Sequence, residues 1–224
     1  MSSHPFAKVI VVSDFDGTIV NVDTTEVVLD LNADPGWRRI DEAIERGEVS
    51  FEDSLRQEFA MIRVPQEVIL GQLDRVAAIR PNFGRLVDYC VSNGMELMVA
   101  SGGFDFCIQH FLNRDEWLKF MQIHAPKSRF TENGYTLTFP EKVTPASVNF
   151  KDDLVRREKM KGKGVFFVGD GFSDYPAARE ADFAFAIKAS RLAGLCREGN
   201  VPHTEVTDFQ EVVDALIVRL REGS

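Results

Sequence analysis

Four short apolar runs dominate the sequence and restrict the folds that it can adopt. They read KVIVVS (8–13), MELMVAS (95–101), GVFFVGD (164–170) and DFAFAI (182–187). Each run has the length of a β-strand and is apolar almost throughout, which is the pattern of a strand covered on both faces. Strands of this kind form parallel sheets with helices on either side, so the runs predict an α/β fold.

Helical patterns separate and follow these runs. Apolar residues recur at helical spacing in 83–94, 173–181 follows a polar cap, and 206–220 is typical of a closing amphipathic helix. The alternation predicts a doubly wound, Rossmann-like parallel sheet built from residues 1–21 and 81–224.

Two segments break this alternation. Residues 22–80 are rich in Glu, Arg and spaced aliphatic residues, and they predict several helices and no strong strand. We therefore expect a small helical cap inserted directly after the first strand. Residues 122–140 alternate on both sides of an Asn-Gly pair, which predicts a short β-hairpin.

Composition excludes several classes of function. The net charge of −9 argues against a broad basic surface for nucleic acid, so an anionic substrate needs a local positive group. The three cysteines are far apart and odd in number, which argues against a disulfide framework and favours a reducing cytoplasm. The N-terminus lacks the hydrophobic run of a signal peptide, and no apolar stretch reaches the roughly 20 residues that a membrane span needs. The sequence therefore predicts no membrane segment. The pattern makes no prediction of oligomeric state.

Acidic pairs follow two of the predicted strands. Asp14 and Asp16 stand in SDFDGT, and Asp170 and Asp174 stand in GDGFSD. Ligands bind at the carboxyl ends of the strands in open α/β sheets, and clustered carboxylates repel unless a cation compensates them. Hard oxygen ligands suit Mg²⁺, and such a pair can also act as nucleophile and general acid. The alternative for each pair is a structural turn or a capped helix start.

Two further features offer anion binding. In ASGGFD, the Ser101 hydroxyl and the N–H groups of Gly102–Gly103 can cradle an anion, although Ser-Gly-Gly is also common in plain loops. In NFKDDLV, the Lys151 ammonium can balance both phosphate and carboxylates, with Lys127 and Lys142 as alternatives. Each motif is weak by itself, and their combination carries the argument.

In combination, these motifs resemble a known family. DFDGT, a Ser after a second strand, a Lys before GDG and a downstream Asp are similar to the four ordered signatures of the haloacid dehalogenase (HAD) superfamily, over about residues 8–187. The helical insert resembles the C1 cap of the phosphoserine-phosphatase-like branch. Within that branch, SGGFDF, GDGFSDYPAA and LAGLCREGNVPHTEVTDF are most similar to the methionine-salvage phosphatases that act on 2-hydroxy-3-keto-5-methylthiopentenyl-1-phosphate.

The resemblance implies roles for the acidic residues. Asp14 would attack phosphorus and form an aspartyl-phosphate, and Asp16 would protonate the leaving alcohol and then activate water. Asp14 and Asp170 would give carboxylate oxygens to Mg²⁺, Asp16 its backbone carbonyl, and Asp174 would orient the waters of the metal.

The resemblance also implies substrate contacts. Ser101, Gly102 and Lys151 would hold the phosphoryl oxygens. Phosphoserine phosphatases carry a Glu nine residues after the nucleophile, where this chain has the shorter Asp23. Glu26 and Asp30 are alternatives on the same helical stretch, and Asp23 is equally suited to cap that helix.

The resulting hypothesis is a Mg²⁺-dependent phosphomonoester hydrolase of a small phosphorylated metabolite, with methionine salvage first and phosphoserine second. An alternative of another class is a non-catalytic, phospho-accepting regulatory domain, against which the helical insert and Asp16 argue. Phosphotransfer to a sugar or alcohol acceptor is a third possibility.

Overall fold

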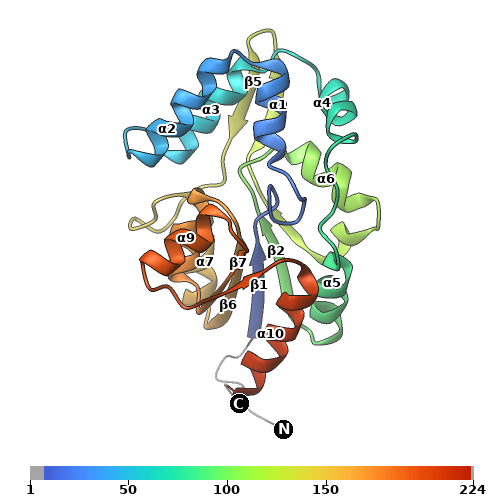
Figure 1. Cartoon of the computed structure of the whole chain (residues 1–224), viewed down its shortest axis with the longest axis vertical. Coiled ribbons are helices and arrows are strands. Elements are labelled where there is room, and N and C mark those ends of the chain that lie inside the picture. Colours follow the sequence, from blue (N-terminus) through green and yellow to red (C-terminus); the bar gives the residue numbers. More distant parts are fainter. Residues whose placement is uncertain (1–7, 223–224) are drawn as a thin grey trace.

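The computed structural model describes residues 8–222, in which six parallel strands form one sheet between two layers of helices (Figure 1). The order across the sheet is β3-β2-β1-β6-β7-β8. The strands are β1 (Lys8–Ser13), β2 (Glu96–Ala100), β3 (Gln122–His124), β6 (Lys163–Gly169), β7 (Phe183–Ile187) and β8 (His203–Val206). All four predicted runs form strands, and the predicted doubly wound α/β fold is confirmed.

The apolar runs are continuous because alternate residues enter two different cores. In β1, Val9 and Val11 belong to the core on one face, and Ile10 and Val12 belong to the core on the other face. The first core includes α5 (Phe83–Ser92), α6 (Asp105–Asn113) and α10 (Phe209–Glu222). The second includes α7 (Phe150–Met160), α8 (Tyr175–Glu180) and α9 (Arg191–Glu198). Short 3₁₀ turns occur at η2 (Trp117–Phe120) and η3 (Phe172–Asp174).

The segment between β1 and α5 is helical, as its composition predicts. It contains α1 (Thr24–Asn32), a 3₁₀ turn η1 (Pro35–Trp37), α2 (Arg38–Glu45), α3 (Phe51–Met61) and α4 (Gln66–Leu73). These helices lie beyond the carboxyl end of β1, above the sheet in Figure 1. The division into a core and a cap of residues 22–80 is our proposal for this arrangement. Within the described residues, no helix combines the length and apolarity needed to cross a membrane.

The two connections between this helical segment and the sheet run side by side. Val20 and Ile79 form an isolated antiparallel bridge. The Asn21 N–H donates to the Ala78 carbonyl at 3.0 Å, and the Arg80 N–H donates back to the carbonyl of Ile19 at 2.7 Å. The entry and exit of the insertion are thus held together by backbone hydrogen bonds.

The predicted hairpin forms around the predicted Asn-Gly pair, but over a shorter range. Strands β4 (Lys127–Thr131) and β5 (Gly134–Thr138) pair in antiparallel fashion, whereas residues 122–124 join the main sheet as β3. The hairpin packs against α3 of the helical insertion (Figure 1). Gly134 has φ +91°, and a Cβ there would lie 2.2 Å from the Ala60 carbonyl oxygen. Only glycine therefore permits this close contact.

Candidate active site

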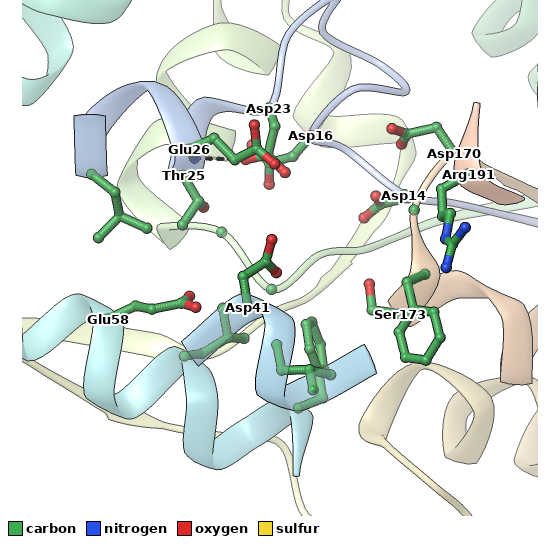
Figure 2. A pocket seen from close by; sticks show the side chains of 18 of the residues that line it. Asp14, Asp16, Asp23, Thr25, Glu26, Asp41, Glu58, Asp170, Ser173 and Arg191 are labelled. Atoms are coloured by element: carbon green, nitrogen blue, oxygen red, sulfur yellow. Dashed lines mark hydrogen bonds between the residues drawn. The ribbon is translucent and has the colours of Figure 1, made fainter. Parts of the chain in front are cut away.

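A pocket of about 390 Å³ lies between the carboxyl ends of the central strands and helices α1–α3 (Figure 2). Of the residues singled out from the sequence, the pocket is lined by Asp14, Asp16, Asp23, Gly102, Lys151 and Asp170. Ser101 and Asp174 are fully buried and do not line it. Residues from distant parts of the chain therefore converge at one edge of the sheet, as the strand ends predict.

Asp14 and Lys151 form the centre of this arrangement. The Asp14 N–H donates to the Val168 carbonyl at 2.8 Å, so this residue continues the pairing of β1 with β6. The Lys151 Nζ, on a side chain that is 2% exposed, donates to Asp14 Oδ1 at 2.7 Å and to Asp174 Oδ1 at 2.7 Å. The two alternative lysines, Lys127 and Lys142, do not line the pocket.

The position of Lys151 depends on the start of α7. The Asn149 side chain accepts hydrogen bonds from the N–H groups of Lys151 at 2.8 Å and Asp152 at 3.2 Å. The Asp152 carboxylate accepts in return from the Asn149 N–H at 2.7 Å, which completes a capping box. Asn149 Nδ2 also donates to the Ser173 carbonyl at 2.9 Å, joining this cap to the loop after β6. Asn149 was not among the residues predicted from the sequence, although Asn three residues before an acidic residue is a recognisable cap signal.

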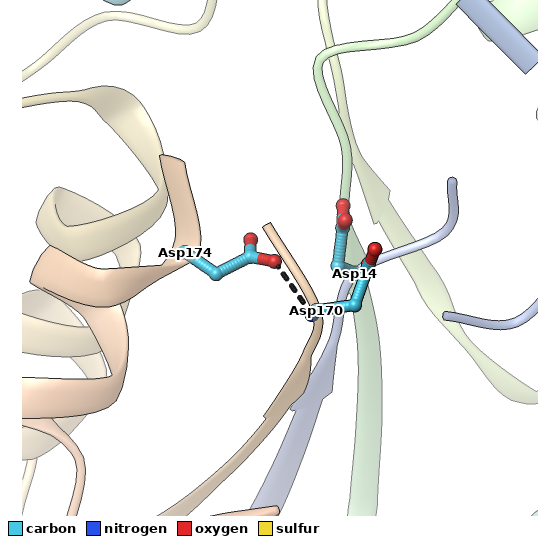
Figure 3. A group of neighbouring side chains, drawn as sticks. All are labelled: Asp14, Asp170 and Asp174. Atoms are coloured by element: carbon cyan, nitrogen blue, oxygen red, sulfur yellow. Dashed lines mark hydrogen bonds between the residues drawn. The ribbon is translucent and has the colours of Figure 1, made fainter. Parts of the chain in front are cut away.

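Asp14, Asp170 and Asp174 could hold a metal ion. Each can contribute one carboxylate oxygen to a group whose atoms all lie within 4.8 Å of one another (Figure 3). Asp174 Oδ2 accepts from the N–H groups of Asp170 at 3.0 Å and Gly171 at 2.9 Å. The Thr18 hydroxyl donates to Asp170 Oδ1 at 2.6 Å. The oxygen-only donors and these supporting hydrogen bonds fit a hard cation such as Mg²⁺.

The electrostatics of this cluster also fit a cation. Burial, and then the nearby Asp174 carboxylate, raise the pKa of Asp14 well above its ordinary value, against the opposing effect of Lys151. Burial and Asp174 likewise raise the pKa of Asp170 to about 7. Burial alone would lower the pKa of Lys151, but Asp14 and Asp174 outweigh it and raise that pKa. One ammonium therefore leaves excess negative charge, which a divalent ion would neutralise.

The Asp16 carboxylate is not part of the three-carboxylate cluster and is held by other residues. Its Oδ2 accepts from the Ser101 hydroxyl at 2.9 Å, and its Oδ1 accepts from the N–H of Thr24 at 3.2 Å and from the Thr24 hydroxyl. Burial raises the pKa of Asp16, while the hydrogen bonds from Thr24 and Ser101 lower it. The Ser101 oxygen also accepts from the Gly103 N–H at 2.9 Å. Thr24 carried no recognisable signal in the sequence.

Asp23 both caps α1 and lines the pocket. Its Oδ1 caps α1 by accepting from the Glu26 N–H at 2.9 Å, and its side chain lines the pocket. Burial, and then the neighbouring Asp16 carboxylate, raise the pKa of Asp23 well above its ordinary value. Glu26 lines the pocket as well, whereas Asp30 lies outside it and pairs with Arg38 at 2.8 Å.

Comparison with known proteins places this site in a family. The profile of the haloacid dehalogenase-like hydrolases matches residues 11–179, and the chain belongs to that family. Curated relatives include 2-hydroxy-3-keto-5-methylthiopentenyl-1-phosphate phosphatases from Brevibacillus brevis, 28% identical with 93% of this chain and 95% of the relative covered, and from Exiguobacterium sibiricum, 26% identical with 92% and 95% covered.

Solved structures agree on the fold. A substrate-bound phosphoserine phosphatase complex matches with a TM-score of 0.70 at 20% identity, covering 93% of this chain and 98% of the other. A phospho-aspartyl intermediate analogue of phosphoserine phosphatase matches with a TM-score of 0.71 at 21% identity and the same coverage. The predicted fold, and the predicted assignment to a phosphatase branch of the superfamily, are thus confirmed.

Proposed function

We propose that the protein is a Mg²⁺-dependent phosphomonoester hydrolase that acts on a small phosphorylated metabolite through an aspartyl-phosphate on Asp14. The observation that supports this proposal most is the clustering of the Asp14, Asp170 and Asp174 carboxylates, two of which pair with Lys151, at the edge of one pocket. Such a site can bind a phosphoryl group and stabilise the charge that moves during its transfer.

The proposed reaction has two steps at the same phosphorus. An Asp14 oxygen attacks, the bond from phosphorus to the alcohol oxygen breaks, and Asp16 gives its proton to that oxygen. A water molecule then attacks the aspartyl-phosphate, Asp16 takes up a proton from it, and free phosphate and the Asp14 carboxylate are released. A positioned acid and base of this kind contributes about 10²–10⁴-fold in rate. The raised pKa of Asp16 supports its role as a proton carrier.

The other residues hold the phosphoryl group in this proposal. The Lys151 ammonium, the Ser101 hydroxyl and the Gly102 N–H would contact its oxygens. Mg²⁺, when held by Asp14, Asp170 and the Asp16 carbonyl and oriented through Asp174, would supply additional positive charge. Alignment and charge stabilisation, rather than further covalent chemistry, would then account for the rate.

Two substrates are candidates. The names of the curated relatives support 2-hydroxy-3-keto-5-methylthiopentenyl-1-phosphate. The place of Asp23 in the pocket supports phosphoserine as the second candidate, because a carboxylate there could meet an ammonium group. We also propose a reducing cytoplasm as the location, supported by Cys90, Cys107 and Cys196, which are all free and buried.

The test measures phosphate release from p-nitrophenyl phosphate and from a metabolite panel that contains both candidates. We expect turnover with Mg²⁺, its loss with EDTA and its recovery on adding Mg²⁺ again. Asp14→Asn should reduce turnover to background, whereas Asp88→Asn, an exposed acid on α5, should not change it. Undiminished hydrolysis by Asp14→Asn would contradict the proposal, and lasting stoichiometric phosphorylation without turnover would favour the regulatory alternative.

A further inference from the structure

The end of the pocket away from the three-carboxylate cluster is acidic. Figure 2 shows Glu26 of α1 and Glu58 of α3 across the cavity from Asp14 and Asp170, with Asp41 of α2 between the two ends. These three cap-side acids come from separate helices, so no single turn or helix start accounts for their meeting.

Glu58 distinguishes this cluster from an ordinary acidic surface. Its side chain is only 5% exposed and lines the pocket, yet none of the described residues gives its carboxylate a hydrogen bond or an ion pair. Glu52 is six residues earlier on the same helix and 6% exposed, and its Oε1 accepts from the Phe150 N–H at 3.1 Å and lies 3.4 Å from Lys142 Nζ. Buried carboxylates are normally paired in this way, because an unpaired one is costly.

The surroundings of Glu58 lack the positive charge that it needs. Burial, followed by the carboxylates of Asp41 and Glu26, raises the pKa of Glu58 to about 8. Only two basic residues occur in the described lining of the pocket, Lys151 and Arg191. Lys151 is held by Asp14 and Asp174, and Arg191 Nη2 lies 3.4 Å from Glu45 Oε2. A ligand is therefore the available source of a cation for Glu58.

We propose that Glu58 binds a cationic nitrogen of the substrate, so that the pocket prefers phosphomonoesters of amino alcohols that carry no carboxylate. This preference replaces both candidate substrates named above, because the first has no nitrogen and phosphoserine carries a carboxylate. The inference rests on the proposed function, which places the phosphoryl group at the Asp14 end of the pocket. A carboxylate beside the nitrogen would face Glu26 and Asp41 with no unpaired cation in the described lining, and like charges that close repel.

A matched pair of substrates tests the charge alone. 2-Aminoethyl phosphate and n-propyl phosphate have the same chain length and differ in an ammonium or a methyl group at the end. We expect kcat/KM with Mg²⁺ to be about 10- to 100-fold higher for 2-aminoethyl phosphate, as for one charge-assisted hydrogen bond. O-Phosphoserine should rank below 2-aminoethyl phosphate. In Glu58→Gln the ratio of the two kcat/KM values should fall close to one, and in Glu67→Gln, an exposed acid of α4, it should not change.

Binding to an Asp14→Asn variant separates this inference from the proposed reaction. That variant should leave the esters intact, so calorimetry can measure the Kd of each ester with and without Glu58→Gln. If the ammonium ester binds more tightly and this preference requires Glu58, the inference is supported, even if the wild type hydrolyses neither ester. Absence of hydrolysis would refute the proposed hydrolase and not the inference. Equal Kd values for the two esters, no binding of the ammonium ester, or better turnover of neutral or carboxylate-bearing esters overturns the inference.

Discussion

The unpaired carboxylate of Glu58 predicts that the ligand-free protein becomes more stable when this residue is changed to Gln. Glutamine has almost the same shape and cannot ionise, so the substitution removes the buried titratable group without opening a cavity. Leu55 and Phe59, on either side of Glu58 in the sequence, belong to the larger apolar core and supply the packing of this part of α3. The fold therefore does not depend on this carboxylate.

The magnitude follows from the pKa of Glu58, which burial and the neighbouring Asp41 and Glu26 raise from 4.5 to about 8. Between these values the unfolded chain has released the proton while the folded protein still holds it. The free energy of unfolding therefore falls as pH rises through this window, by about 1.4 kcal/mol per pH unit. At pH 7 the wild type should have lost roughly 3 kcal/mol relative to pH 4.5 through this group, and Glu58→Gln should escape that loss.

Urea unfolding at several pH values between 5 and 8 measures the effect. The difference in the free energy of unfolding between Glu58→Gln and wild type should be small at pH 5 and should grow steadily to pH 8. Glu67→Gln, whose side chain is exposed, should give a curve parallel to wild type. If Glu58→Gln also ran parallel to wild type over this range, the carboxylate would have a partner or free access to water, and the reasoning would be refuted.

Three further substitutions test the arrangement of the active site. A Cβ on Gly103 would lie 2.4 Å from Asp16 Oδ2, so Gly103→Ala should displace that carboxylate and lower kcat by about 10²-fold. An unchanged kcat in a steady-state assay would contradict this. Thr18→Val removes the 2.6 Å hydrogen bond to Asp170 and should raise the Mg²⁺ concentration for half-maximal activity by about 10-fold or more. An unshifted Mg²⁺ titration would argue against Asp170 as a ligand. Lys151→Met leaves the buried carboxylates of Asp14 and Asp174 without their ammonium, so it should lower the free energy of unfolding by about 3–5 kcal/mol in metal-free buffer. Equal stability of the variant and the wild type in urea unfolding would show that these two ion pairs are not needed.

The parts of the fold that were predicted are those in which burial determines the residue pattern. Residues 8–13 and 164–169 are recognisable because both of their faces are covered, which makes them apolar throughout. The two edge strands were missed for the opposite reason. Gln122–His124 and His203–Val206 are short and only partly buried, so their polar residues give neither an apolar run nor a clear alternation.

The candidate site shows the same division. Asp14 and Asp170 could be placed together because parallel strands end at one edge of the sheet. The hydrogen bonds of Thr24 and the meeting of Glu58 with Asp41 depend on how α1, α2 and α3 are rotated and packed. Sequence spacing does not contain that information, because a helix has several polar positions and only the packed structure decides which one enters the pocket.

The bridge between Val20 and Ile79 has a consequence for how the helical insertion between them can change. The chain enters the insertion near Val20 and leaves it near Ile79, and these two crossings are paired. The intervening helices are therefore attached to the sheet through one short two-stranded connection. The strands that carry Asp14 and Asp170 end before these crossings, so the insertion can be replaced without moving those two residues. Thr24 lies within the insertion and holds the Asp16 carboxylate, so a replacement has to keep an equivalent donor there. Because residues of the insertion form much of the lining of the pocket, their exchange is a physically simple way to change that lining while the sheet stays the same.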